Sequence, residues 1–326
     1  MNFKRLSIAL LVITVSIFII TSFAVAQDFP NKEITVVIPF DAGGNIDRLA
    51  RMTAPYWEKE LGVPVVCENI PGAQGQVGFE TFSRRPADGY TIAVGTEPYL
   101  TATIIRGASY SYDDFKFINI QEFDPLTLVV NSDSKYNTAE ALLQDIKEHP
   151  GEISYGVEPG GWDYIIAQKI KEQLNLDARE VFYEGGGPLR IALMGGHVDF
   201  IFDSVGGCIS MGEKARVLAV DNTQGTKLWP DVPTLNEVLE KYDASVPAVG
   251  SIRFWMVRSE LEKEYPQRYQ ILLETYEKAM NNENFIKELK EKGFYDVTQV
   301  MSPESANEMM VEVNKLVNEY KDMFIQ

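Results

Sequence analysis

The sequence predicts an α/β protein, and three observations support this fold class. Runs rich in Val and Ile that are typical of strands alternate with runs of helical periodicity along the chain. About 300 residues remain after an N-terminal signal, which is long enough for two lobes of ordinary domain size. Glycine-rich turns follow several expected strands, at the edge where such sheets bind ligands. These observations favour a small-ligand site over a surface for macromolecules.

The first 26 residues are typical of a secretory signal. Lys4 and Arg5 form a basic start, residues 8–20 are almost wholly apolar, and Ala24–Ala26 precede Gln27. We expect cleavage after Ala26 and a periplasmic location. An uncleaved membrane anchor is the weaker alternative, because the apolar run is short for a membrane span.

In the first half of the chain, residues 34–40 predict a buried strand, and residues 46–61 have helical spacing up to the stop signal Gly62. Further strands are expected at residues 63–69, 91–96 and 126–131. Glycine-rich turns follow at residues 42–45 and 72–78.

In the second half, Thr138 is expected to cap a helix that runs through Lys147, and Ser302 to cap the last helix, with Pro303 in its first turn. Strands are expected at residues 152–156, 198–204 and 216–221, and glycine-rich turns at residues 156–161, 185–187 and 206–207. The alternation predicts a parallel sheet with helices on both faces.

The charge balance excludes some partners. The chain has 30 Lys and Arg against 47 Asp and Glu, a formal net charge of −17. Nucleic acids and anionic lipids require basic patches, so neither is expected as a partner. Cys67 and Cys208 lie in apolar contexts far apart in the sequence, and we interpret both as buried free thiols.

The residues that catalysis needs are scarce. His149 and His197, the two histidines, lie in turns, and the chain has no G-x-S-x-G elbow, H-E-x-x-H or C-x-x-C motif. We therefore expect no enzyme activity, no metal site and no cofactor. Carboxylate pairs are plentiful, so an exported hydrolase that uses two carboxylates stays open as the lesser alternative.

Several motifs occur in an order that resembles a known family. They are "PFDAGGNIDRLAR", "VCENIPGAQGQVGFE", "ADGYTIAVGT", "YEGGGPLRIALMGGHVDFIFDS" and "WPDVPTLNEV". In this order they resemble the substrate-binding receptors of tripartite tricarboxylate transporters, the Bug-type extracytoplasmic solute receptors. The resemblance implies a type II periplasmic-binding-protein fold, with two lobes that close over a small ligand, mostly a carboxylate.

The resemblance also implies lobe boundaries and partners. Lobe 1 would contain residues 27–124 and 251–326, lobe 2 residues 125–250, and the segments 123–130 and 250–257 would cross between them. The receptor would act as a monomer, without a cofactor, and deliver its ligand to a membrane permease. A receptor that signals to a membrane sensor stays open as an alternative.

Ligand contacts are implied on the motifs that match the family. Backbone amides at a helix start bind anions, which agrees with this placement. The implied contacts in lobe 1 are Phe40, Ala42, Gly43, Gly44, Asn45, Asp47 and Thr96. Those in lobe 2 are Gly160, Gly161, Trp162, Gly185, Gly186 and Asp203.

Acidic residues depart from the family pattern on the same loops. They are Asp41, Glu97, Glu158, Asp163 and Glu184. A carboxylate that faces the cleft repels a ligand carboxylate, so we expect Asp41, Glu97 and Glu158 to contribute to the site and the ligand to carry an amine or to be neutral. The alternative is that these acids point to solvent and a simple carboxylate binds.

Overall fold

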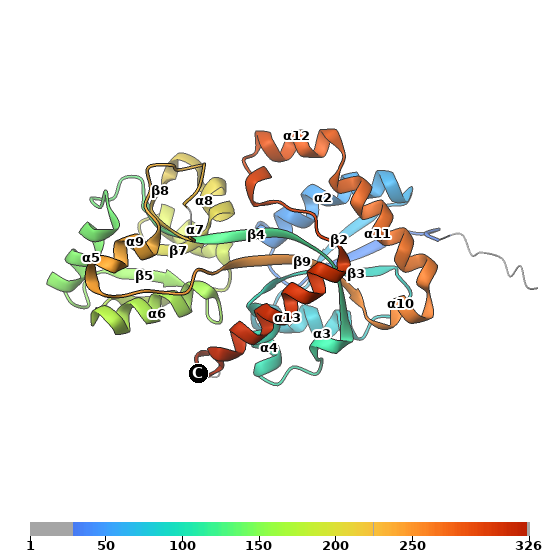
Figure 1. Ribbon diagram of the computed structural model, residues 1–326, viewed down its shortest axis with the longest axis horizontal. Helices are drawn as coiled ribbons and strands as arrows, with labels where there is room; N and C mark the ends of the chain where they lie inside the picture. The colour runs from blue at the N-terminus through green and yellow to red at the C-terminus, as the bar shows by residue number, and fades with distance from the viewer. Residues whose placement is uncertain (1–28, 224, 325–326) are drawn as a thin grey trace, which may run out of the picture.

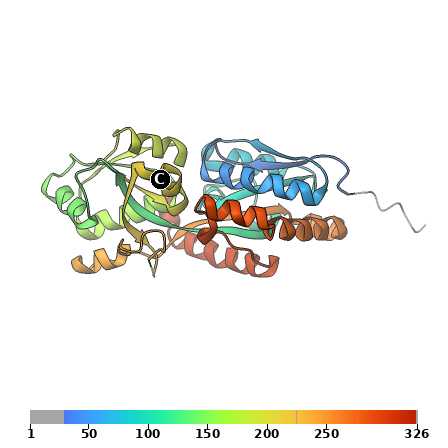
Figure 2. The same cartoon turned by 90° about the horizontal axis from the view of Figure 1, so that it is seen from above.

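The computed structural model describes residues 29–223 and 225–324, so the expected signal and its cleavage site lie outside the described residues. The chain forms two lobes that lie side by side along the long axis of the molecule (Figure 1). Figure 2 shows the same division from above. Among the described residues, every helix is too short or too polar to cross a membrane.

One mixed sheet runs through both lobes. Its order is β2-β1-β3-β9-β4-β7-β5-β6, with β8 also paired to β4. The strands are β1 (Ile34–Ile38), β2 (Val65–Asn69), β3 (Thr91–Glu97), β4 (Phe115–Asn131), β5 (Ser154–Val157), β6 (Arg179–Phe182), β7 (Phe200–Ser204), β8 (Ala215–Asp221) and β9 (Gly250–Arg258).

The expectation of a parallel sheet is correct only for part of each lobe. Strand β1 pairs in parallel with β2 and β3, and β5 pairs in parallel with β6 and β7. Strand β9 is antiparallel to β3 and β4, and β4 is antiparallel to β7 and β8. The reason is that β4 leaves the first lobe and β9 returns to it in the opposite direction, so neither is joined to its neighbours by a simple βαβ crossover.

The long strand β4 changes partners near its middle. Its residues 115–125 pair with β9, and residues 126–131 pair with β7 and β8. Gly250 lies opposite Pro125 at this change. A Cβ on Gly250 would lie 2.6 Å from the Asp124 carbonyl oxygen, so only glycine permits the two strands to approach so closely. The two strands form the connection between the lobes (Figure 1).

The helices cover both lobes. They are α2 (Asn45–Leu61), α3 (Gln76–Ser83), α4 (Tyr99–Ile105), α5 (Ala139–Glu148), α6 (Trp162–Leu174), α7 (Gly186–Met194), α8 (Val205–Met211), α9 (Leu235–Leu239), α10 (Glu260–Glu264), α11 (Pro266–Met280), α12 (Glu283–Glu291) and α13 (Pro303–Glu319). The predicted caps are confirmed: the Thr138 hydroxyl accepts from the Ala141 N–H, and the Ser302 hydroxyl from the Ser305 N–H.

The last helix, α13, contacts both lobes. Ala306 and Met310, near its start, are buried with Phe117 and Phe254 of the first lobe. Val317, near its end, is buried in a cluster that also contains core residues of the second lobe. The helix lies across the molecule from one lobe to the other (Figure 1).

Both cysteines are free thiols, as predicted. Cys208 is buried, but Cys67 is only partly buried because it lies on β2 at the edge of the sheet, so the expectation of burial holds for one of the two.

Candidate ligand-binding cleft

A cavity of about 100 Å³ lies where the two lobes meet. Helix N-termini from both lobes contribute to it. Its lining is Phe40, Asp41, Ala42, Gly44, Asn45, Ile46, Thr96, Pro98, Tyr99, Leu126, Glu158, Gly161, Trp162, Asp163, Glu184, Gly185, Gly186, Gly187, Pro188, Phe202, Asp203, Ser204, Ser251 and Arg253.

The first wall of the cavity is the turn between β1 and α2. Gly44 is the N-cap residue of α2, and in the described structure no side chain caps that end. Asp47 stabilises the turn: its carboxylate accepts from the Gly43 N–H at 2.9 Å and from the Asn69 amide at 3.0 Å. The start of α2 thus presents backbone donors to the cavity from a fixed turn.

The second wall is built from two helix N-termini. Gly161 is the N-cap of α6 and Gly185 the N-cap of α7, and within the described chain neither end has a side-chain cap. Gly185 has φ 105°, a conformation that favours glycine, and Gly186 follows as the first residue of α7. Three helix starts therefore face one cavity from two lobes.

Two hydrogen bonds bridge the cavity from lobe to lobe. The Asn45 amide donates to the Ser204 hydroxyl at 3.0 Å, and the Tyr99 hydroxyl donates to the Glu158 carboxylate at 2.9 Å. Asn45 and Tyr99 are each the first residue of a helix in the first lobe, while Ser204 ends β7 and Glu158 directly follows β5 in the second. The two walls are therefore joined directly by these hydrogen bonds.

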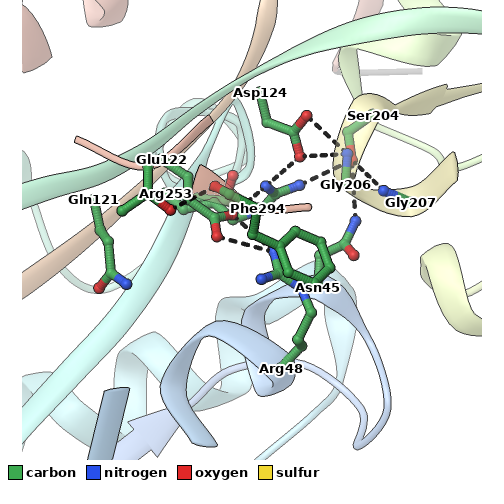
Figure 3. A network of polar contacts seen from close by, with 12 residues as sticks. Asn45, Arg48, Gln121, Glu122, Asp124, Ser204, Gly206, Gly207, Arg253 and Phe294 are labelled. Atoms are coloured by element: carbon green, nitrogen blue, oxygen red, sulfur yellow. Dashed lines mark hydrogen bonds and ion pairs between the residues drawn. The ribbon is translucent and has the colours of Figure 1, made fainter. Parts of the chain in front are cut away.

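A buried ion network lies behind the cavity, at the crossing strands (Figure 3). Arg253 is 2% exposed, and its guanidinium donates to Glu122 at 2.6 Å and to Asp124 at 2.5 Å. Arg48 also pairs with Glu122, at 2.9 Å. Two arginines thus balance two carboxylates, and the burial that opposes ionisation is outweighed for Glu122, whose pKa these arginines lower.

The network reaches both walls of the cavity. Arg253 donates to the Ser204 hydroxyl at 3.0 Å, which is the same oxygen that accepts from Asn45. Asp124 accepts from the Gly206 N–H at 3.0 Å, close to the start of α8. These buried charges at the crossing strands therefore hold Ser204 and the start of α8 in place.

Arg190 is the second buried cation of the site. It lies on α7 and pairs with Asp203 at 3.2 Å, and each side chain is 6% exposed. Asp203 also accepts from the Ser204 N–H at 2.8 Å. The charge of Arg190 is therefore already met by a carboxylate of its own lobe.

Glu158 and Asp163 form a pair of carboxyl groups on the second wall. Asp163 is 6% exposed and accepts from the Glu158 N–H at 2.6 Å. Burial raises the pKa of both groups; Asp203 raises that of Glu158 further, and Glu158 raises that of Asp163.

Most of the residues predicted for the site lie around this cavity. They are Phe40, Asp41, Ala42, Gly44, Asn45, Thr96, Glu158, Gly161, Trp162, Gly185, Gly186 and Asp203. Asp41 and Glu184 are exposed at its rim, so of the acids on these loops Glu158, Asp163 and Asp203 are the more enclosed.

Four predicted residues are outside the lining, namely Gly43, Asp47, Glu97 and Gly160. Gly43 and Asp47 hydrogen-bond to each other. Glu97 is fully buried and accepts from the Thr101 N–H and hydroxyl, at 3.1 and 2.7 Å. Burial raises its pKa to about 7. Sequence position alone could not show that the Glu97 side chain is buried outside the cavity lining.

Sequence reasoning missed several residues of the site, among them Tyr99, Ser204 and Arg253 in the lining, and Arg190, which pairs with the lining residue Asp203. Arg253 carried a usable signal, because it is a charge inside the apolar strand "GSIRFWMV". Tyr99 and Ser204 gave none, since their partners are distant in sequence: Tyr99 and Glu158 are 59 residues apart, and Asn45 and Ser204 are 159 apart.

One cluster outside the cleft has the residue types of a metal site. Asp145, Glu148 and His149 hold ligand atoms within 4.8 Å of one another on α5. Asp145 is already paired with Lys135 at 2.8 Å. This exposed group is better explained as a surface ion pair.

Comparisons with known proteins identify the family. The model of the Tripartite tricarboxylate transporter family receptor matches residues 49–319. A UPF0065 protein from the tcbD–tcbE intergenic region of Pseudomonas sp. is 29% identical over 214 residues, which span 64% of this chain and 64% of that protein, just under two thirds. A UPF0065 protein from the gbd 5' region of Cupriavidus necator is 29% identical over 275 residues, 80% of this chain and 79% of that protein.

Solved structures share the fold. The periplasmic binding protein BugD has a TM-score of 0.76 and 23% identity, over 91% of this chain and 97% of its own. MatC from Rhodopseudomonas palustris with bound malate has a TM-score of 0.75 and 21% identity, over 91% and 100%. Another R. palustris protein, solved with adipate, has a TM-score of 0.74 and 23% identity, over 91% and 97%. The expected two-lobed periplasmic-binding fold is confirmed, and the chain belongs to the receptor family of the tripartite tricarboxylate transporters.

Proposed function

We propose that this protein captures a small carboxylate in the cleft between its lobes and delivers it, chemically unchanged, to a membrane permease. The observation that carries the proposal is the pair of helix N-termini, α2 from the first lobe and α7 from the second, that face one cavity with glycine N-caps. Backbone N–H groups at helix starts bind anionic oxygens without a counter-charge.

The comparisons support the ligand class and the place of action. The related folds were solved with malate and with adipate, both carboxylates. The family name assigns its members to a tripartite transporter, and BugD is a periplasmic protein. A periplasmic location after cleavage behind Ala26, and delivery to a permease rather than to a membrane sensor, are parts of the same proposal.

The lobe boundaries belong to the proposal too. We place lobe 1 at residues 27–124 and 251–326 and lobe 2 at residues 125–250, since β4 changes its partners at Pro125 and Leu126. Closure of the lobes around the ligand would make and break the Asn45–Ser204 and Tyr99–Glu158 bonds.

The test is a thermal-shift panel on the mature chain with malate, succinate, adipate, amino acids and amines. A true ligand raises the melting temperature with concentration as mass action requires. The bound ligand is then recovered and weighed by mass spectrometry. We expect it unchanged after long incubation; repeated turnover would show an enzyme instead.

A variant tests the role of the helix start. Gly44→Asp places a carboxylate at the N-cap of α2, where it accepts from the helix's own first N–H groups. The Gly44 backbone is extended, with φ −76°, so the substitution is compatible with folding. We expect affinity for the ligand carboxylate to fall at least tenfold while the melting temperature without ligand holds or rises. Equal affinity of the variant and the wild type would contradict the proposed contact.

A further inference from the structure

The charges of the second wall do not balance. Arg190 is paired with Asp203, and Arg253 with Glu122 and Asp124. Among the described residues, no Lys or Arg forms an ion pair with Glu158 or Asp163, although both line the cavity. Two carboxyl groups therefore face the ligand space without a cation of the protein.

The local fold directs these two groups to the same place. Glu158 begins the loop that follows β5, and Asp163 lies in the first turn of α6, where it accepts from the Glu158 N–H. A Cβ on Gly161 would lie 1.9 Å from a carboxylate oxygen of Asp163 and 2.8 Å from the Tyr99 hydroxyl. The glycine therefore leaves the room that lets Asp163 and Tyr99 approach each other.

We propose that Glu158 and Asp163 receive the ammonium group of the ligand, so that the captured solute carries a carboxylate at one end and an amine at the other. This inference rests on the proposed function, because it takes the carboxylate end to lie at the start of α2 or α7. Glu158 and Asp163 would then be the residues that determine which charge the ligand bears.

A dicarboxylate fits this wall poorly. Its second carboxylate would meet Glu158 and Asp163, while the nearby cations Arg190 and Arg253 are already neutralised. Because burial raises the pKa of both groups, a dicarboxylate would either need the wall to be protonated or meet an ionised carboxylate. Repulsion from one ionised carboxylate about 5 Å away weakens binding on the order of a hundredfold at an effective dielectric near 20. The wall therefore selects against the ligand class of the related structures and in favour of an amino acid.

The same geometry predicts a proton signal on binding. Glu158 is faced by Asp163 on α6, Tyr99 on α4, Asp203 on β7, Arg190 on α7 and Arg253 on β9. Because burial raises the pKa of Glu158, the empty site holds part of a proton near neutral pH. An ammonium group favours the ionised form and releases that proton. A second ligand carboxylate favours the protonated form and takes a proton up.

The experiment uses matched ligands that differ in one charged end: adipate against 6-aminohexanoate, and succinate against 4-aminobutyrate. Titration calorimetry of the mature chain near pH 7, in two buffers of different ionisation enthalpy, gives the affinity and the number of protons exchanged. We expect at least one amine-bearing compound to bind at least tenfold more tightly than its dicarboxylate partner, with release of protons.

Variants identify the groups that respond. Asp163→Asn and Glu158→Gln remove one charge each and should each weaken the amine-bearing ligand at least tenfold and reduce the proton release. Glu152→Gln, an exposed acid of the same lobe, is the control and should leave both values unchanged. Circular dichroism checks that each variant folds, and if Asp163→Asn does not, Glu158→Gln gives the same test, because the Glu158 side chain accepts from the Tyr99 hydroxyl whereas Asp163 accepts from the backbone of its own loop.

The outcomes separate this inference from the function beneath it. If dicarboxylates bind more tightly than their amine partners and proton uptake accompanies binding, the ammonium subsite is wrong while the receptor function stands. Unchanged amine affinity in both folded variants also overturns the subsite. If no carboxylate or amine binds at all, the proposed function itself fails.

Discussion

The two walls of the cleft both present helix N-termini, but they differ in where their acidic side chains lie. The first wall offers backbone donors at the start of α2, and its buried acids are engaged elsewhere: Asp47 with Gly43 and Asn69, and Glu97 with Thr101. On the second wall, donors at α6 and α7 lie beside carboxyl groups that open into the cavity. Both walls contain buried acids, but only on the second wall do buried or partly buried acids, Glu158 and Asp163, line the cavity.

This difference shows that the number of acids near a site does not decide its charge. Glu97 is bonded to Thr101 outside the lining, whereas Asp163 is in the lining, so of the two only Asp163 is placed to contact a ligand. The cleft is therefore asymmetric, with backbone donors on both sides and enclosed carboxyl groups on one, since Asp41 of the first wall is exposed at the rim.

The largest expected effect comes from the junction between the walls. Arg253→Met leaves Glu122 and Asp124 buried with one fewer cation, at 1% and 0% exposure. Removal of one partner from a buried ion pair typically costs about 3–5 kcal/mol, so we expect the free energy of unfolding to fall by that amount in chemical denaturation.

Arg51→Met is the matched control for that substitution. Arg51 pairs with Asp47 but its side chain is 50% exposed, so its loss should cost no more than about 1 kcal/mol. If both variants lose the same stability, the buried ion network of Arg253 is no stronger than a surface pair and the walls are not joined through it.

The next effect concerns the acid held behind the first wall. The pKa of Glu97 is raised by burial to about 7, from the usual value of about 4.5 for glutamate. The folded state thus holds a proton that the unfolded state loses first, and the contribution of Glu97 to stability is full below about pH 4.5 and lost as the pH rises through about 7. Each pKa unit corresponds to about 1.4 kcal/mol, so the loss is about 3 kcal/mol.

Glu97→Gln should remove this part of the pH dependence. We expect the difference in unfolding free energy between pH 5 and pH 8 to shrink by up to about 3 kcal/mol, even if the variant is less stable at both. Glu148→Gln, on the surface of α5, is the control and should keep the wild-type slope. An unchanged slope in Glu97→Gln would mean that Glu97 is ionised in the folded protein.

The smallest effect compares one glycine from each wall. Gly161 and Gly44 have similar extended backbones, with φ −90° and −76°. A Cβ on Gly161 would collide with Asp163, whereas on Gly44 the nearest atom, the Asp41 carbonyl oxygen, is 3.5 Å away. We expect Gly161→Ala to cost about 1–3 kcal/mol and Gly44→Ala to change stability by less than about 1 kcal/mol, as thermal unfolding would measure. Equal losses would show that the second wall is no more crowded than the first.

The sequence predicted the scaffold of the site well, and the reason is local. Sequence patterns record features that depend on neighbouring residues. These include the glycine turns after strands, the Thr138 and Ser302 caps and the apolar strands. The direction of β4 and β9 was not predicted, because pairing between residues more than a hundred positions apart leaves no local pattern.

The site chemistry was predicted less completely for the same reason. Arg190 and Arg253 are neutralised by carboxylates that the sequence does not place beside them. Asp41 and Glu158 look alike as loop acids, yet one lies at the exposed rim and the other meets Tyr99 across the cleft. Only the tertiary structure shows which acids remain for the ligand.

The path of β4 and β9 has a consequence for how the chain assembles as it is exported. The second lobe's strands β5 to β8 follow one another between residues 154 and 221, so that lobe has most of its sheet as soon as they emerge. The first lobe lacks β9 until residue 250, and until then β3 has an unpaired edge. We expect the second lobe to form first and the first lobe to wait for its returning strand, a period in which its open edge is exposed to aggregation. Helix α13 follows β9 in the chain and packs across both lobes, so the two lobes are joined by this helix only after residues 303–319 have been made.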